Sequence, residues 1–205
     1  MSEYDYQYSE SHDVIYCYAN SRVLKNKFDI RDASKLAQVE RDITGLKIVM
    51  LQQNPIKGVF DIKHLQKIHK YIFEDIYSWA GKLREGEFLV KDDTIFCRGS
   101  FINQFAADIH SKLKGEHYLK GLSIEIFAER MAYYMGEINA LHPFREGNGR
   151  TSRVYFAMLA SKAGYDLDFS VLDKEALLDA DIFAFERDYV PLIRLLKNAI
   201  SHKNP

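Results

Sequence analysis

The chain has 205 residues, of which 28 are Lys or Arg and 29 are Asp or Glu, so its formal charge is −1. A nearly neutral chain lacks the excess of basic side chains that neutralises nucleic acid or an anionic membrane over a wide area. We therefore expect neither of these as a direct partner. The length and the 47% hydrophobic content are typical of one globular domain.

Nothing in the sequence predicts a disulfide framework, a signal peptide or a membrane span. Cys17 and Cys97 lie far apart among apolar neighbours, which indicates reduced thiols. Residues 1–13 are polar, and the longest apolar run, residues 154–160, is too short to cross a membrane. We expect a protein of the cytoplasm, or an effector secreted into a host cell without an N-terminal signal.

Helical periodicity dominates the chain. Apolar residues recur at spacings of three and four behind Asp32, Asp61, Ser100 and Ser123, which are residue types suited to helix N-caps. The four patterns predict helices over residues 36–50, 62–76, 102–113 and 124–138, the last of which runs on to Leu141.

A fifth helix is expected from about Gly149 to Ala163, with Gly164 just past its end. This segment is apolar on nearly every side, which is typical of a helix buried at the centre of a bundle. Two shorter helices are predicted over residues 173–184 and 189–201, and Pro191 falls in the first turn of the second.

One segment breaks the helical pattern. Residues 87–90 and 95–98 are β-prone and flank the polar stretch 91–94, which predicts a small β-hairpin. An isolated hairpin has unpaired edges, so it needs a covering element or a function. The expected architecture is all-α, a helical bundle around a central buried helix with one hairpin. We expect a single domain over 1–205, with a core at about 20–200 and an N-terminal extension at 1–15.

The loop between the fourth and fifth helices has the features of an anion site. Gly147 and Gly149 allow successive backbone N–H groups to converge, and the fifth helix begins there with unpaired N–H groups and the positive end of its dipole. Arg150 and Arg153 are three residues apart and so lie on one face of the first helical turn. Together they predict a site for a di- or triphosphate without a basic surface.

Two further side chains of this loop carry chemistry. His142 offers an imidazole, the side chain whose ordinary pKa lies nearest neutrality, and suits a general base that takes a proton from an attacking hydroxyl. Glu146 offers a hard carboxylate oxygen, which suits Mg²⁺ bridging the phosphates of a substrate. The G-x-x-x-x-G-K-[ST] loop is absent, so P-loop chemistry is excluded.

Residues 142–153, His-Pro-Phe-Arg-Glu-Gly-Asn-Gly-Arg-Thr-Ser-Arg, match every fixed position of the H-x-F-x-[D/E]-G-N-G-R-x-x-R signature of the Fic (filamentation induced by cyclic AMP) family. The chain resembles this family over about residues 20–200, with further similar blocks at 26–32, 76–82, 133–139 and 188–193. The resemblance is strongest to the toxin or effector branch that a separate antitoxin inhibits.

The resemblance implies a protein adenylyltransferase that transfers AMP from MgATP to a Ser, Thr or Tyr hydroxyl of a target protein and releases pyrophosphate. His142 would be the general base and Glu146 the Mg²⁺ ligand. The resemblance also implies an anion hole formed by Gly147, Asn148 and Gly149, with Arg150 and Arg153 on the β- and γ-phosphates.

The hairpin at 87–98 would be the family's flap, which pairs with a strand of the target along its edge. Lys91 and Asp92 at its tip would contact target or nucleotide.

The family's phosphotransferase branch carries Lys at the position of Gly149, so protein phosphorylation is disfavoured. The inhibitory pattern [S/T]-x-x-x-E-[G/N] is absent from the chain, so an inhibitory helix is expected on a separate small antitoxin that docks at Arg153.

Two alternatives stay open at the level of sequence. One is a Fic-type transferase that moves UMP, phosphocholine or phosphate, because the motif does not specify the base pocket. The other is a non-catalytic module that captures a partner strand with the hairpin, although the intact His142 and Glu146 argue against it. His64, His69, His110 and His117 lack metal-site spacing and are assigned structural roles, and Trp79 is assigned to the core.

Overall fold

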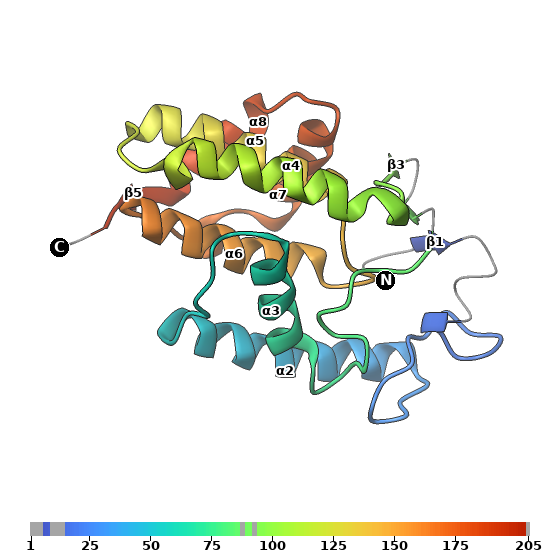
Figure 1. Cartoon of the computed structure of the whole chain (residues 1–205). Coiled ribbons are helices and arrows are strands. Elements are labelled where there is room, and N and C mark those ends of the chain that lie inside the picture. Colours follow the sequence, from blue (N-terminus) through green and yellow to red (C-terminus); the bar gives the residue numbers. More distant parts are fainter. Residues whose placement is uncertain (1–5, 9–14, 87–88, 92–93, 204–205) are drawn as a thin grey trace.

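The computed structural model describes residues 6–8, 15–86, 89–91 and 94–203. Helices follow one another through most of this part of the chain, as the periodicity predicts (Figure 1). They are α2 (Ala33–Gln53), α3 (Ile62–Phe73), α4 (Ile102–Gly115), α5 (Ile124–Leu141), α6 (Asn148–Ala163), α7 (Lys174–Phe185) and α8 (Val190–Ala199). Short 3₁₀ turns lie at η1 (Gly99–Phe101), η2 (His117–Leu119) and η3 (Phe169–Val171).

Aspartate caps fix the starts of two of the predicted helices. The side chains of Asp32 and Asp61 each accept a hydrogen bond of 2.8 Å from a backbone N–H in the first turn of α2 and α3. The expected cap at Ser100 is wrong, because η1 precedes α4 and places Ser100 inside that turn. Gly164 ends α6 with φ +100°, a left-handed conformation that favours glycine.

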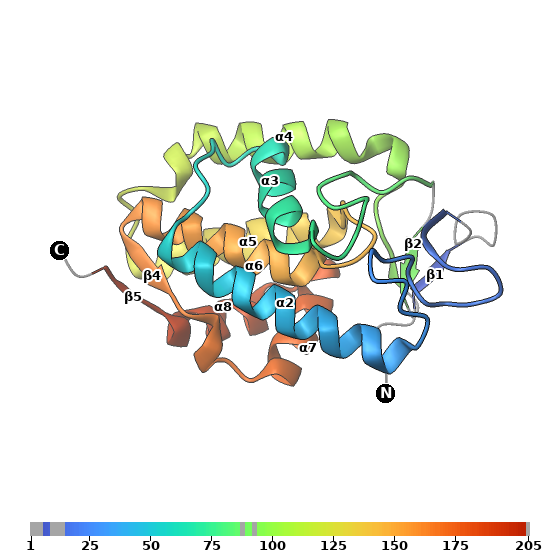
Figure 2. The same cartoon turned by 90° about the horizontal axis from the view of Figure 1, so that it is seen from below.

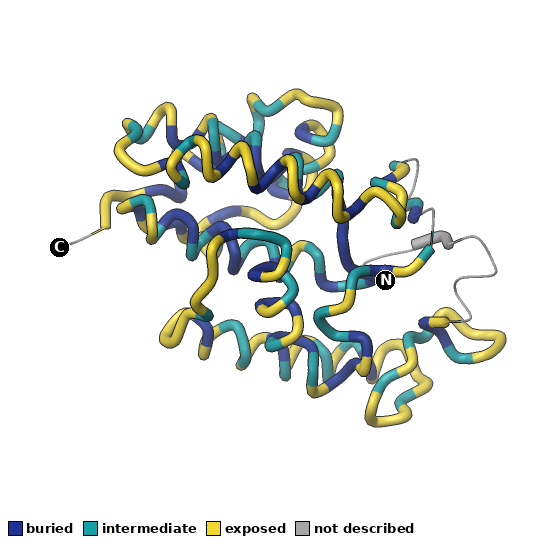
Figure 3. Tube along the Cα trace, viewed as in Figure 1, coloured by how far each residue is buried: buried dark blue, intermediate teal, exposed yellow. Residues whose placement is uncertain are grey.

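The helix α6 occupies the middle of the molecule, which confirms the predicted central buried helix. It packs against α3 on one side and α5 on the other, and it also contacts α2 and β4 (Figures 1 and 2). Colouring by burial shows α5 and α6 lined with buried residues, whereas α4 exposes its outer face (Figure 3). One hydrophobic cluster of buried side chains runs from Tyr16 to Ile200. The motif loop therefore starts its helix inside the core.

Strands form two small antiparallel sheets. The first has the order β1-β2-β3, from β1 (Tyr6–Tyr8), β2 (Leu89–Lys91) and β3 (Thr94–Ile95). The predicted hairpin is therefore present, and β1 covers the edge of β2 that the sequence left unpaired. Its second strand ends at Ile95 rather than at Arg98, and residues 87–88 of the expected first strand lie outside the described residues. Residues 92–93 of its turn lie outside the described part of the chain.

The second sheet was not expected from the sequence. It pairs β4 (Tyr165–Leu167) with β5 (Ile200–His202). The prediction that the last helix extends to Ser201 is wrong, because α8 ends at Ala199 and the next residues pair with β4 instead. Within the described residues, no helix is both long enough and apolar enough to cross a bilayer.

Candidate active site

His142 stands at the end of α5, where the chain turns into the motif loop. It is the C-cap residue in a left-handed conformation (φ 42°, ψ 61°), and its N–H donates to the carbonyl of Ile138 at 3.1 Å. Arg84 braces this turn, because its Nε donates to the His142 carbonyl and its backbone N–H to the Pro143 carbonyl, each at 2.8 Å. The same guanidinium donates to the carbonyl of Cys97, next to the flap.

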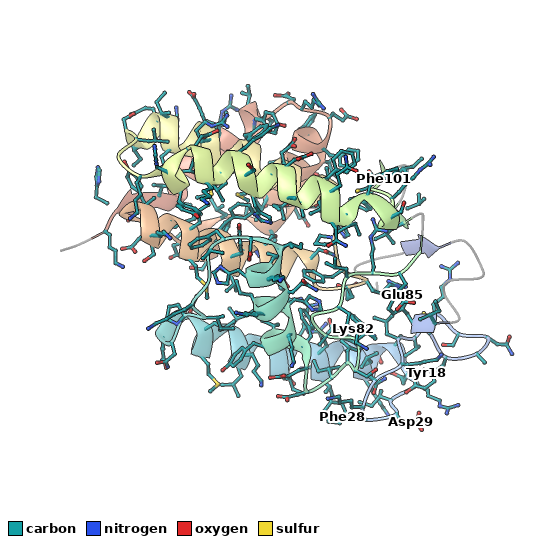
Figure 4. The ribbon with its side chains drawn as sticks, viewed as in Figure 1. Tyr18, Phe28, Asp29, Lys82, Glu85 and Phe101 are labelled. Carbon is teal, nitrogen blue, oxygen red and sulfur yellow. The ribbon has the colours of Figure 1, made fainter. Side chains whose placement is uncertain are left out.

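The segment that carries Arg84 runs along one side of the molecule. Figure 4 shows the neighbouring Glu85 on the stretch that leads from α3 towards β2, between Phe101 and Tyr18 in that view. The backbone N–H of Glu85 donates a hydrogen bond to the hydroxyl of Tyr16 at 2.8 Å. Arg84 thus ties the turn at His142 to a segment that is itself anchored.

Two contacts orient the imidazole of His142. Its Nδ1 lies 3.2 Å from the carbonyl oxygen of Asn139, and because a carbonyl only accepts, Nδ1 carries the proton and Nε2 the lone pair. The ring of Phe96 stacks on the imidazole with centroids 3.8 Å apart and planes 26° apart. The imidazole is buried to 6% exposure. The lone pair needed by a general base is therefore on Nε2.

Buried contacts hold the loop after His142 in shape. The Asn148 amide accepts from the N–H of Phe144 at 2.9 Å and donates to the Phe144 carbonyl at 2.8 Å. The Phe144 ring stacks on His69 with centroids 3.9 Å apart. Nε2 of His69 donates to the carbonyl of Glu146 at 3.0 Å, while Nδ1 accepts from the N–H of Gly81 at 2.8 Å. The loop is thus fixed from both α3 and α6.

The backbone at the start of α6 has the left-handed glycine that the predicted nest requires. Gly147 has φ +81°, and a β-carbon there would lie 2.2 Å from the buried ring of Phe73, so only glycine fits. The first N–H groups of α6 have no partner within the helix. A β-carbon at Gly149 would lie 3.2 Å from Nη1 of Arg153, which places that guanidinium against the nest.

Arg150 points the other way, towards α2. Its Nη2 lies 2.5 Å from Oε1 of Glu40 and 3.4 Å from Oε1 of Glu146, and its Nη1 donates to the Thr44 hydroxyl at 3.2 Å. The Tyr77 hydroxyl donates to the other oxygen of Glu40. Burial disfavours the charged guanidinium, but the two carboxylates outweigh it and raise the pKa of Arg150. The two motif arginines therefore occupy separate environments.

Comparison with known proteins agrees with this geometry. The Fic/DOC family matches residues 59–160. The chain is 34% identical over 186 residues to the probable protein adenylyltransferase Fic of Escherichia coli K12, and the match covers 91% of this chain and 92% of that protein. The chain belongs to the Fic/DOC family.

Two further relatives of this Fic protein are informative. This chain is 39% identical over 179 residues to the protein adenylyltransferase VbhT of Bartonella schoenbuchensis. The match covers 87% of this chain but 37% of VbhT, so the chain spans well under half of that relative. The crystal structure of the BepC protein of Bartonella tribocorum, a VirB-translocated effector with bound AMPPNP, superposes with a TM-score of 0.89 at 26% identity, over 94% of this chain and 99% of that one.

Glu146 is the candidate metal ligand of this Fic protein. Its Oε1 accepts from the N–H of Gly147 at 2.8 Å and faces Arg150, and neither contact uses Oε2. Burial and the nearby Glu40 raise the pKa of Glu146, while Arg150 opposes the shift. In the part of the chain that is described, no three His, Cys, Asp or Glu side chains cluster as metal ligands. One carboxylate fits Mg²⁺ that takes its other ligands from phosphates and water.

The predicted site residues are gathered at one place, with two exceptions at the flap. His142, Glu146 and the nest lie together at the junction of α5 and α6. Lys91 ends β2, and Asp92 lies outside the described residues. Cys97 is half-buried, and burial raises the pKa of its thiol, which agrees with a packing role.

Glu40 and Phe96 are among the residues that contact the site and that sequence reasoning missed. Glu40 lies four residues after Leu36 and four before Thr44, both of which α2 buries, so a carboxylate on the apolar stripe was the available signal. Phe96 lies just past β3 and stacks on His142. Nothing in its local sequence indicates that contact, because the two rings are 46 positions apart in the chain.

Proposed function

We propose that this Fic protein is a protein adenylyltransferase that transfers AMP from MgATP to a hydroxyl side chain of a target protein. The observation that supports the proposal most is the contact of His142 Nδ1 with the Asn139 carbonyl oxygen at 3.2 Å, which leaves the lone pair to Nε2, one short loop before the N-terminus of α6. Curated relatives at 34–39% identity bear the name protein adenylyltransferase, and BepC was crystallised with AMPPNP.

In the proposed reaction, the target hydroxyl oxygen attacks the α-phosphorus of ATP. A new phosphorus–oxygen bond forms to the target, the bond between the α-phosphorus and the oxygen bridging to the β-phosphate breaks, and pyrophosphate leaves. Nε2 of His142 takes the hydroxyl proton. The N–H groups of the nest stabilise the charge that grows on the α-phosphate.

The remaining motif residues bind the rest of the nucleotide in this proposal. Glu146 holds Mg²⁺, which neutralises phosphate charge when bound. Arg153, which lies against Gly149, binds the γ-phosphate. Arg150 is assigned to the β-phosphate. Its Nη2 contacts Glu40 in this structure, so the phosphate would either share the guanidinium with Glu40 or replace Glu40 as its partner. A target strand would dock at the flap.

The decisive experiment uses ATP labelled with ³²P at either the α or the γ position, with Mg²⁺ and a bacterial lysate as the source of targets. Label in protein from α but not from γ is expected, and it disappears in His142→Ala. The matched control is His202→Ala, an exposed histidine of β5 that retains labelling. Label from γ alone would contradict adenylylation, and so would α-label that survives in His142→Ala.

The regulation proposed from the family resemblance is a separate small antitoxin. Its inhibitory Glu would pair with Arg153 and exclude the γ-phosphate. A synthetic helical peptide carrying the [S/T]-x-x-x-E-[G/N] pattern is expected to inhibit α-labelling by the wild-type protein but not the residual activity of Arg153→Ala. Equal inhibition of both proteins would contradict the assigned contact. The name of BepC describes a translocated effector. We propose that this protein acts in the cytoplasm or is translocated into a host cell as an effector.

A further inference from the structure

The flap already holds a strand of its own chain. β1 pairs antiparallel with β2, with Tyr6 opposite Lys91, Gln7 opposite Val90 and Tyr8 opposite Leu89 (Figure 2). We propose that β1 occupies the place of a target strand and that a target segment must displace it to be modified. This inference rests on the proposed adenylyltransferase function and identifies the occupant of its target-docking edge.

The direction of the backbone groups shows why the two strands compete. The N–H of Phe96 donates to the carbonyl of Leu89 at 3.0 Å, so the N–H and carbonyl of Leu89 face β3. Because these groups alternate sides along an antiparallel strand, those of Val90 face β1. Gln7 and Val90 are therefore the pair that exchanges two hydrogen bonds. An added strand would need the same two groups of Val90.

Just past the opposite edge of the sheet, the chain turns into the body of the domain. The N–H of Cys97, which follows β3, faces away from β2 and donates to the carbonyl of Ala140 in the last turn of α5 at 3.0 Å. Beyond Cys97 the chain enters η1 and α4. Within the described residues, an extended segment is paired with the edge of β2, and we expect a target strand to add at this same edge.

The register of β1 lines it up with the base. Tyr8 lies opposite Leu89, which is opposite Phe96 across the hairpin, and the Phe96 ring stacks on His142 at 3.8 Å. Leu89 and Phe96 are buried and pack together. A strand in the position of β1 lies about 4.8 Å beyond β2, and its residue opposite Leu89 is in the same row as the catalytic imidazole. β1 therefore follows the path required of a substrate strand.

The test compares Gln7→Pro with Gln7→Ala. Proline removes the N–H that donates to Val90, whereas alanine keeps the backbone and removes the side chain only. Hydrogen exchange of the Val90 amide is expected to be slow in the wild type and Gln7→Ala and at least roughly tenfold faster in Gln7→Pro, the effect of losing hydrogen bonds of about 1 kcal/mol each. Labelling of lysate proteins from α-labelled ATP is expected to rise severalfold in Gln7→Pro only.

The outcomes separate this inference from the proposed function. If the Val90 amide exchanges hydrogen at the same rate in Gln7→Pro and Gln7→Ala, the pairing of β1 with β2 is overturned. If exchange is faster in Gln7→Pro but the labelling of lysate proteins is unchanged, the competition between β1 and the target is overturned. If no variant labels protein, the proposed function fails and the competition with it. The exchange of Val90 measures the β1 pairing without any activity, so the two failures are told apart.

Discussion

Glu40 and Arg150 are 110 residues apart in the chain and meet at 2.5 Å between Oε1 and Nη2. Their side chains are only 13% and 21% exposed. Glu40 also accepts from Tyr77, so one carboxylate joins α2, the turn that follows α3 and the motif helix. Breaking such a sheltered pair leaves a charge without its partner, which costs far more than breaking an exposed pair.

We therefore expect Glu40→Gln to lower the free energy of unfolding by about 2 to 3 kcal/mol, measured by urea denaturation at pH 7. Arg150 would also shift towards Glu146, and α-labelling would fall. The matched control is Asp29→Asn, which removes a carboxylate paired with Arg31 while both side chains are at least 70% exposed. Its effect is expected within about 0.5 kcal/mol. Equal losses in the two variants would contradict a sheltered ion pair.

The two motif glycines are expected to respond differently to alanine. At Gly147 the new methyl group meets Phe73 at 2.2 Å in a left-handed conformation. Strain and overpacking together predict a loss of about 2 to 4 kcal/mol in stability. At Gly149 the nearest atom is the flexible end of Arg153, at 3.2 Å, and alanine favours the helix by up to about 1 kcal/mol.

Gly149→Ala should thus keep or raise the melting temperature while it lowers the rate of α-labelling, because the methyl group covers the nest and displaces Arg153. Gly147→Ala should lose melting temperature and activity together. Thermal unfolding by circular dichroism and the labelling rate measure the two effects. Full activity in Gly149→Ala would argue against the nest as the phosphate site.

Stability should fall in mild acid because burial lowers the pKa of His64, His69 and His110, most of all that of the last two. Burial lowers the pKa of His69 to about 3 and that of His110 to about 4. Between these values and the ordinary pKa of about 6.5, the unfolded chain binds protons that the folded chain does not. The free energy of unfolding is therefore greatest above pH 6.5 and decreases as pH falls, by up to about 1.4 kcal/mol per pH unit for each histidine.

Urea unfolding from pH 7 to pH 4.5 measures this slope. His69→Asn is expected to be less stable at pH 7, since the stack on Phe144 is lost, but to show a smaller slope, because one of the histidines with a lowered pKa is gone. The exposed His202 provides the control, because His202→Asn should retain the slope. An unchanged slope in His69→Asn would mean that this imidazole is not kept neutral by the fold.

The stack of Phe96 on His142 predicts a contribution to the orientation of the base. Phe96→Leu keeps an apolar side chain but loses the aromatic face 3.8 Å from the imidazole. We expect kcat for α-labelling to fall about tenfold, an effect of about 1.4 kcal/mol, with little change in the KM for ATP. Phe101→Leu is the control, since Phe101 is 42% exposed and lies outside this stack. A change in KM alone would contradict an orienting role.

Local sequence was sufficient to predict most helices and to place most of the candidate site residues on one loop. Asp32 and Asp61 cap the helices that they were expected to start, because capping acts within one turn. The loop from His142 to Arg153 was assigned from adjacent residues whose chemistry is local. Ser100 failed as a cap because η1 precedes α4.

Only the tertiary structure decided the contacts between segments that lie far apart in the chain. The end of α8 at Ala199 depends on the pairing of β5 with β4, and the cover on the flap depends on β1. The direction of Arg150 depends on Glu40. Helical periodicity, caps and the motif are determined by residues within a few positions of each other. Strand partners and buried ion pairs are determined by which surfaces meet when the chain folds, so a single sequence specifies them without displaying them.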